Sequence, residues 1–338
     1  MKKALITGVT GQDGAYLANF LLEKGYKVFG TRRRSSSANT WRLEYFGIID
    51  NPNFNLIDSD ITDLGDNIRL LESCDPDEVY NLAAQSFVGT SFYQPKLTAE
   101  ITGLGNLTIL EAIRIVNKKI KFYQASSSEM FGKVQQTPQS EKTNFYPRSP
   151  YAVAKLFAHW STINYRESFD MFTACGILFN HESPLRGEEF VTKKITKGLS
   201  NIKLGKQKVL YLGNLNAKRD WGHAKDYVRA MWLMLQSQKP DDYVISTGRT
   251  ETIKTFINLS CKNLGFKTKW QGQGLDEQCI NIESGDPIIK IDEEFFRPNE
   301  VDLLIGDSSK AQEKLGWKTT SSLEELCQEM VDFDLGKK

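Results

Sequence analysis

The sequence has few of the residues that would cross-link a small domain or hold a structural metal. Its five cysteines, Cys74, Cys175, Cys261, Cys279 and Cys327, lie far apart and include no Cys-x-x-Cys pair and no histidine at zinc-finger spacing. This pattern predicts neither a disulfide framework nor a zinc site. We therefore expect a protein of a reducing compartment that binds no metal.

The chain also lacks long apolar runs and an excess of one charge. Only Ala4, Leu5 and Ile6 follow the basic start at Lys2 and Lys3, which is shorter than a secretory signal requires. No apolar run approaches the roughly 18 residues that span a bilayer. Forty-three basic and 42 acidic residues give a net charge of +1, which provides no general attraction for nucleic acid or an anionic membrane. We expect a cytoplasmic protein that binds neither.

What the chain does contain is a regular alternation of short apolar runs and helical patterns. Alternating β and α segments predict an α/β protein with a doubly wound parallel Rossmann sheet. The expected strands are 3–7, 26–30, 54–57, 78–82, 120–124, 172–178 and 243–246, and the clearest expected helices are 106–116, 151–169, 226–236, 253–264 and 323–333.

The length of 338 residues predicts two domains at about 150 residues per domain. Helical and strand periodicity weakens after Asn180, and residues 183–217 are rich in lysine and glycine. We expect a nucleotide-binding Rossmann domain over 1–180, completed by about 218–248, and a smaller, mostly C-terminal α/β substrate domain over 181–338.

A glycine-rich turn follows the first strand and opens the first helix. Gly8, Gly11 and Gly14 are spaced Gly-x-x-Gly-x-x-Gly, and Thr10, Gln12 and Asp13 lie between them. Glycines let backbone N–H groups approach a pyrophosphate at the positive end of a helix dipole. A bare glycine triplet can also be a plain turn, but this context is typical of a dinucleotide site.

The second strand ends in arginines where a site selective for NAD would carry a carboxylate. Arg33 and Arg34, with the serines after them, suit a ribose 2′-phosphate. A solvated basic loop is the alternative. We predict NADP as the cofactor, with Asp60 after the third strand near the adenine or, equally, an ordinary surface residue.

Tyr151 and Lys155 are four residues apart, so in a helix they share one face. The ammonium could lower the pKa of the phenol, which would then accept a proton from a sugar hydroxyl. Such a pair is common by chance as a surface feature. Here it follows a fifth strand that runs into a small polar stretch holding Ser127 and Glu129, at the sheet edge where these folds bind ligands.

With these motifs the chain resembles the GDP-mannose 4,6-dehydratases, of the extended short-chain dehydrogenase/reductase type. The resemblance runs through nearly the whole chain, in segments 6–14, 33–37, 122–126, 145–151, 176–184, 218–227 and 296–302. It departs at Ser127, where the family usually carries threonine; serine keeps the hydroxyl but loses the methyl that restricts its rotamer.

The resemblance implies a redox-neutral dehydration of GDP-mannose to GDP-4-keto-6-deoxymannose. Tyr151, assisted by Lys155, would take the proton of O4 while NADP⁺ takes hydride from C4. The ketone then acidifies the C5 hydrogen, which Glu129 removes while water leaves C6. Hydride returns to C6, Tyr151 supplies the remaining proton, and the cofactor ends as it began.

The resemblance also implies the remaining contacts. The expected cofactor site comprises Gly8, Thr10, Gly11, Gln12, Asp13, Gly14, Arg33, Arg34, Asp60, Ile61, Leu82, Ala83, Ala84, Ser86, Tyr151, Lys155, His181 and Arg186. The expected substrate site comprises Ser86, Ser127, Glu129, Asn180, Lys194, Arg219, Arg297 and Glu300. The loop from Arg33 to Arg42 reaches a neighbour's cofactor in related enzymes, so the resemblance predicts a homotetramer, although a flexible surface loop is the alternative.

Three other functions stay open from the sequence. A GDP-manno-heptose 4,6-dehydratase would differ only in pocket shape. A GDP-sugar reductase or epimerase would not need Glu129. A non-catalytic NADP-sensing protein would use the same fold, but it would be expected to lose Tyr151, Lys155 or Glu129.

Overall fold

A computed structural model describes residues 1–295 and 304–337. Its centre is a seven-stranded sheet in the order β11-β6-β5-β4-β1-β2-β3, with every neighbouring pair parallel. The prediction of a doubly wound parallel sheet is confirmed. The strands are β1 (Lys3–Thr7), β2 (Lys27–Arg32), β3 (Phe54–Asp58), β4 (Glu78–Asn81), β5 (Lys121–Ser127), β6 (Thr173–Leu178) and β11 (Asp242–Ile245).

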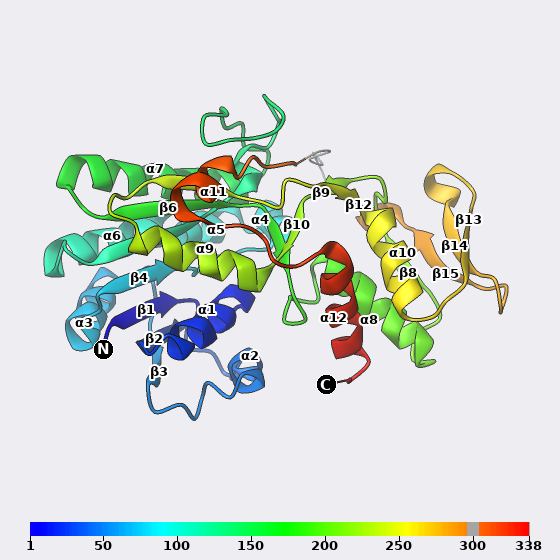
Figure 1. The fold of residues 1–338 in the computed structure, drawn as a ribbon, viewed down its shortest axis with the longest axis horizontal. Coiled ribbons are helices and arrows are strands. Elements are labelled where there is room, and N and C mark those ends of the chain that lie inside the picture. The colour runs from blue at the N-terminus through cyan, green and yellow to red at the C-terminus, as the bar shows by residue number, and fades with distance from the viewer. Residues whose placement is uncertain (296–303, 338) are drawn as a thin grey trace.

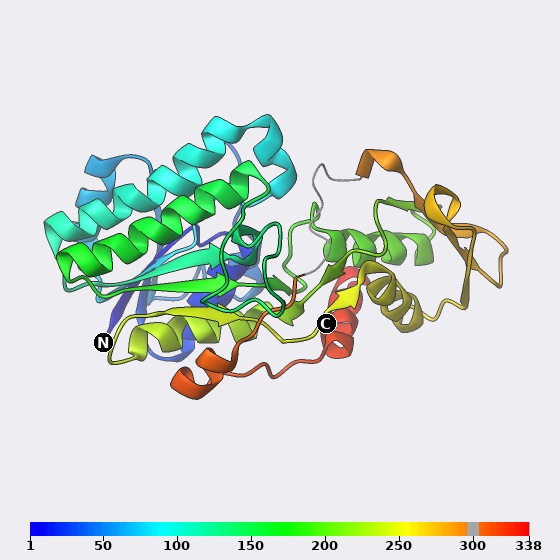
Figure 2. The same cartoon turned by 90° about the horizontal axis from the view of Figure 1, so that it is seen from above.

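Helices cover both faces of this sheet (Figures 1 and 2). Because successive side chains of a strand point to opposite faces, Leu5 packs with α3 and α6, whereas Ala4 and Ile6 pack with α1 and α9. The long helix α7 lies beside α6. The bounds are α1 (Gln12–Glu23), α3 (Leu64–Cys74), α6 (Gly105–Val116), α7 (Pro150–Phe169) and α9 (Ala224–Gln236).

Local sequence explains where the helices that carry the site begin. Gly11 is the N-cap of α1 and has no side chain to cap it, so the first N–H groups of that helix face outward. At the start of α7, the Ser149 hydroxyl accepts from Ala152 N, and Pro150 occupies the first helical position. Both features are typical helix-start signals, and they place Tyr151 in the first turn.

A second, smaller unit lies at the other end of the molecule (Figure 1). It has its own apolar core, which includes Leu199, Phe256, Ile289 and Leu326. It contains a four-stranded sheet in the order β13-β14-β15-β8 and three helices that pack against one another. The elements are α8 (Val191–Lys203), β8 (Leu210–Leu212), α10 (Ile253–Asn263), β13 (Thr268–Gln271), β14 (Gln278–Asn281), β15 (Pro287–Ile291) and α12 (Leu323–Asp334).

The chain crosses between the two units several times. Strands β7 (Asn180–Glu182) and β10 (Trp221–His223) pair in parallel beside the site. Later, Leu304 packs against Met130 and Phe131 of the first unit, and α11 (Ser309–Leu315) returns to β11 and α9. The residues of one unit are therefore not one continuous range.

The structure adds elements that periodicity did not indicate. Helix α8 forms within the lysine-rich stretch because Ile195 and Leu199 form an apolar stripe four residues apart, which the surrounding lysines obscure in the sequence. Shorter elements are α2 (Trp41–Tyr45), α4 (Val88–Tyr93), α5 (Pro95–Thr98), β9 (Lys218–Arg219), β12 (Glu251–Thr252), a π-helix at Ala99–Leu104, and 3-10 turns at Ser128–Met130, Gly274–Asp276 and Glu293–Phe295. Across residues 1–295 and 304–337, none of the helices has the length and apolar character needed to cross a bilayer.

Candidate active site

The glycine turn is packed too closely for side chains. Gly8 has a φ of +68°, and a Cβ there would lie 2.9 Å from the Cα of Ala83. A Cβ on Gly14 would lie 2.6 Å from the carbonyl oxygen of Gly8. The turn therefore presents bare backbone at the start of α1, which suits a pyrophosphate.

A cavity of about 1650 Å³ opens beside this turn and follows the carboxyl ends of β2, β3 and β4. The Asp60 side chain at its wall accepts hydrogen bonds from the backbone N–H and the hydroxyl of Thr62. The expected cofactor residues in its lining are Gly8, Thr10, Gly11, Gln12, Arg33, Asp60, Ile61, Leu82, Ala83, Ala84, Ser86 and Arg186. Arg34 is exposed and does not line it.

A smaller cavity of about 210 Å³ collects the expected chemistry. It shares Gly8, Gln12, Ser86 and Arg186 with the larger cavity, so the two spaces meet at the glycine turn. Its lining includes Asp13, Gly14, Ser127, Glu129, Tyr151, Lys155, Asn180 and His181. Residues that are more than 100 positions apart in the sequence thus line one cavity.

Lys155 is buried and donates a hydrogen bond from Nζ to the carbonyl oxygen of Ala125, 2.7 Å away. Burial lowers the pKa of Lys155 to about 8, because desolvation disfavours the ammonium. The bond ties α7 to the end of β5, the strand that leads to Ser127 and Glu129.

The expectation that Lys155 lowers the pKa of Tyr151 is wrong for the protein in this form. Burial raises the pKa of Tyr151 to about 12, and this effect outweighs the hydrogen bond with Ser127, which acts in the opposite direction. The Lys155 ammonium lies 5.8 Å from the centroid of the tyrosine ring, with its hydrogen bond directed to Ala125 instead. Tyr151 is therefore neutral at ordinary pH.

The sequence did not indicate a buried contact between the end of β5 and α7. The hydroxyl of Ser126 and Nδ1 of His159 are 2.9 Å apart, and burial lowers the pKa of His159 to about 4. His159 is therefore neutral at ordinary pH and fixes the end of β5 against α7. Its spacing of four residues after Lys155 was the available signal, since i,i+4 residues share a helix face.

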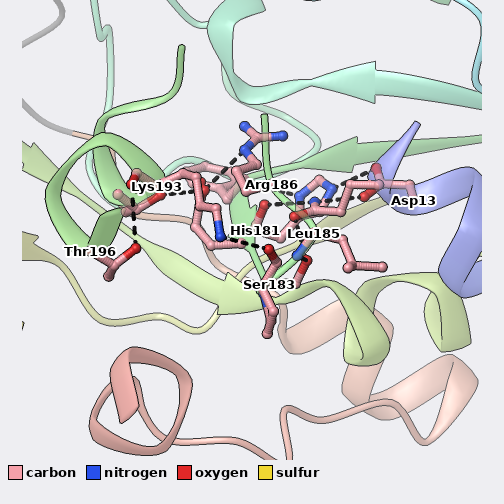
Figure 3. Close-up of polar contacts among 12 residues, drawn as sticks. Asp13, His181, Ser183, Leu185, Arg186, Lys193 and Thr196 are labelled. Atoms are coloured by element: carbon pink, nitrogen blue, oxygen red, sulfur yellow. Dashed lines mark hydrogen bonds and ion pairs between the residues drawn. The ribbon is translucent and has the colours of Figure 1, made fainter. Parts of the chain in front are cut away.

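The start of α1 is joined to β7 by polar contacts that Figure 3 shows. Nε2 of His181 lies 2.7 Å from Oδ2 of Asp13, and Nδ1 lies 2.8 Å from the carbonyl oxygen of Phe179. Burial raises the pKa of Asp13, but the charge and hydrogen bond of His181 outweigh it and lower that pKa to about 2.

Arg186, expected at the cofactor, lies where the two cavities meet. Its Nε lies 2.9 Å from a carboxylate oxygen of Glu182, and the guanidinium stacks 3.5 Å from the Phe190 ring centroid. The Glu182 carboxylate and the Phe190 ring thus position the guanidinium. Glu182 and Phe190 are site residues that the sequence alone did not indicate.

Four expected substrate residues lie apart from these linings or outside the described residues. Lys194 on α8 places its ammonium 3.3 Å from the Phe295 ring centroid, and Arg219 on β9 is buried; neither lines the two cavities. Arg297 and Glu300 fall outside the described residues.

In the loop from Arg33 to Arg42, the side chain of Arg42 hydrogen-bonds to backbone carbonyl groups of the same chain. Arg42 donates from Nε to the carbonyl oxygen of Leu185 at 2.7 Å and from a terminal nitrogen to that of Thr10 at 3.3 Å. This end of the loop therefore belongs to the wall of the large cavity. Arg33 also lines that cavity but is exposed, and Arg34 is exposed and does not line it.

Solved structures with the same fold include enzymes of nucleotide sugars. The Thermotoga maritima UDP-glucose 4-epimerase matches at TM-score 0.82 and 25% identity over 98% of both chains. DesIV, a dTDP-glucose 4,6-dehydratase from Streptomyces venezuelae solved with NAD and TYD, matches at 0.83 and 20% over 98% of this chain and 96% of its own. RMD from Pseudomonas aeruginosa, solved with NADPH, matches at 0.77 and 20% over 100% of both chains. These likenesses show that the chain has the Rossmann-type fold of nucleotide-sugar epimerases and dehydratases.

The sequence comparisons identify the family within this class. The family model for GDP-mannose 4,6 dehydratase matches residues 5–330. The GDP-mannose 4,6-dehydratase of Yersinia enterocolitica is 53% identical over 99% of this chain and 94% of its own length, and that of Homo sapiens is 49% identical over 98% and 91%. The chain belongs to the GDP-mannose 4,6-dehydratase family.

Proposed function

We propose that this protein is a GDP-mannose 4,6-dehydratase that forms GDP-4-keto-6-deoxymannose with NADP as its cofactor. The observation that carries the proposal is the placement of Ser127, Glu129, Tyr151 and Lys155 around one small cavity that meets the larger cavity at the glycine turn. A simple reductase would need the tyrosine and lysine, but not a carboxylate in the same wall.

The residues present fit a nicotinamide dinucleotide. Gly8 and Gly14 leave no room for a Cβ, and the N-terminus of α1, which has no side-chain cap, favours phosphates. When bound, the nicotinamide would accept a hydride from C4 of the sugar and return it to C6. Arg33 at the wall of the large cavity supports NADP over NAD, because a guanidinium pairs well with a 2′-phosphate.

Proton handling falls to the four residues of the small cavity. Tyr151 would take the O4 proton, which requires its raised pKa to fall when the oxidised nicotinamide brings a positive charge into the cavity. Ser127, already hydrogen-bonded to Tyr151, would orient O4. Glu129, half-buried in the same wall, would remove the C5 proton and pass it to the departing C6 hydroxyl, which leaves as water. Tyr151 would return the proton taken from O4 to C5 when C6 receives the hydride. Tyr151 and Glu129 would thus act as general acids or bases.

We assign the remaining contacts with the same proposal. The second unit, mainly within 181–338, would hold the GDP part. Ser86 would lie beside both cofactor and sugar, and the GDP contacts would be Asn180, Lys194, Arg219, Arg297 and Glu300. Oδ1 of Asn180 is buried without a hydrogen-bond partner and lines the small cavity, so it can accept from a ligand hydroxyl. A homotetramer with the loop at 33–42 between subunits is part of the proposal.

The test is direct product analysis. Purified protein with NADP⁺ and GDP-mannose should form a GDP-sugar with a 4-keto group and a 6-methyl group, detected by mass and by NMR. Tyr151→Phe is the matched negative control. Turnover of GDP-manno-heptose without turnover of GDP-mannose would select the heptose enzyme, and coenzyme binding without turnover of either would select a sensor.

A further inference from the structure

His181 is enclosed by two hydrogen-bond acceptors. Its Nδ1 faces the carbonyl oxygen of Phe179 at 2.8 Å, and its Nε2 faces the carboxylate of Asp13 at 2.7 Å. A neutral imidazole has only one N–H, whereas the imidazolium has two. Two acceptors are both satisfied only if His181 carries a proton on each nitrogen.

Asp13 is held as the matching anion. Its Oδ1 accepts from Nε2 of Gln12 at 3.0 Å, and it lies in the first turn of α1, where the helix dipole favours negative charge. Asp13 lies in the lining of the small cavity beside Gly14. The carboxylate therefore sits next to the surface proposed for the cofactor phosphates.

The charged and titratable groups around His181 agree with this assignment. Burial lowers the pKa of His181 and so does nearby Arg186, but Asp13 outweighs both, and the net direction is upward. The ring of Tyr227, from α9, stacks on the imidazole at 4.4 Å between centroids. Because the pKa of His181 is raised in the folded protein, the ring keeps its second proton at pH values below that pKa. It loses the proton as the pH rises through that pKa.

The same contacts tie two segments together (Figure 3). Nε2 of Gln12 also donates to the carbonyl oxygen of His181 at 3.2 Å, and Oε1 of Gln12 accepts from the Ser183 hydroxyl at 2.7 Å. Ser183 in turn accepts from Leu185 N at 3.1 Å. The glycine turn and the segment that leads to Arg186 are thereby fixed relative to each other.

We propose that His181 is a positioning residue that acts through Asp13: as a buried imidazolium it neutralises the carboxylate beside the phosphate site and locks the glycine turn to β7. The charge assignment stands on the structure, and its effect on ligands rests on the proposed nicotinamide cofactor. Without the imidazolium, the Asp13 carboxylate would repel the phosphates and would raise the pKa of Tyr151, on which its charge acts.

The charge itself is tested by NMR of protein with ¹⁵N-labelled histidine. The chain has three histidines, so single variants assign each signal. His181 should show the imidazolium pattern at pH 7 and should lose its proton at least about one pH unit lower in Asp13→Asn, as expected when a paired charge is removed. A neutral His181 at pH 7, or a titration that Asp13→Asn leaves unchanged, would overturn the proposal.

The functional effect is tested by NADPH affinity at pH 7 in a double-mutant cycle. His181→Gln can still donate a hydrogen bond to Asp13 but leaves its charge uncancelled, and we expect binding to weaken by about tenfold or more, equivalent to at least about 1.4 kcal/mol. Asp13→Asn with His181→Gln restores neutrality and should recover most of that loss. A double variant that binds no better than His181→Gln contradicts charge cancellation.

A matched control separates this role from loss of folding. His223 makes a similar contact with Glu329, at 2.9 Å between Nε2 and Oε2, and neither residue lines the two cavities. Glu329→Gln should leave the His181 signal and NADPH affinity unchanged. Circular dichroism of every variant checks the fold. Because neither readout needs sugar turnover, failure here is distinct from failure of the proposed dehydratase activity.

Discussion

The buried ammonium of Lys155 donates to the carbonyl oxygen of Ala125 at 2.7 Å, and this contact joins the helix that carries Tyr151 to the strand that leads to Glu129. A charge is therefore kept in a buried position at a cost in stability, as expected where function needs it.

Lys155→Met should separate stability from activity. We expect kcat to fall by on the order of 10²–10⁴. Burial lowers the pKa of Lys155 to about 8. Between about pH 8 and the ordinary lysine pKa, the unfolded chain therefore binds more protons than the folded one, and stability rises with pH. Below about pH 8 the full cost of burying the ammonium is present, so Lys155 disfavours folding at pH 7. Its removal should raise the free energy of unfolding at pH 7, by at most about 3 kcal/mol. Denaturant unfolding checks this, and a large loss of stability would contradict it.

Glu129→Gln should stop the reaction between its two halves. The amide keeps the shape of the side chain but cannot accept the C5 proton. We expect reduced coenzyme to build up in a single turnover, seen by its near-ultraviolet absorbance, with no 6-deoxy product. Final product at the parental rate would show that another group is the C5 base.

His159 should make the fold sensitive to acid. Burial lowers the pKa of His159 to about 4, so between about pH 4 and the ordinary histidine value the unfolded chain binds the extra proton. Stability should fall as the pH drops through this window, by up to about 3 kcal/mol. In His159→Phe this contribution should disappear from the pH dependence of urea unfolding; an unchanged pH dependence would exclude His159 as its source.

Arg33→Ala should distinguish the two nicotinamide cofactors. Arg33 lines the large cavity, whereas Arg34 does not, so we expect Arg33→Ala to weaken NADPH binding by about tenfold and to leave NADH binding nearly unchanged. Arg34→Ala is the matched control and should have the smaller effect. Equal losses for both coenzymes would contradict a 2′-phosphate contact.

Much of the first unit could be predicted because its signals are local. The glycine turn, the strands and the Tyr151–Lys155 helix each have a short-range period or spacing, and the structure has them at the expected places. The pairing of Asp13 with His181 spans 168 residues, and no local pattern records such a contact. The direction of the pKa of Tyr151 was missed for the same reason, since burial depends on the assembled wall.

The second unit was harder to predict. Strands β13, β14 and β15 are short and partly exposed, so alternation between apolar and polar residues is weak there. Helix α8 buries an apolar stripe among lysines, and its core forms only with α10 and α12. These elements are stabilised by tertiary packing rather than by propensity.

The central claim is that one hydride leaves C4 of the sugar and returns to C6 within the same closed cavity. GDP-mannose carrying deuterium at C4 tests this most directly. The account predicts that the isolated product carries the deuterium in its new methyl group, with none in the solvent. Deuterium in the solvent or on released coenzyme, with an unlabelled methyl group, would contradict it.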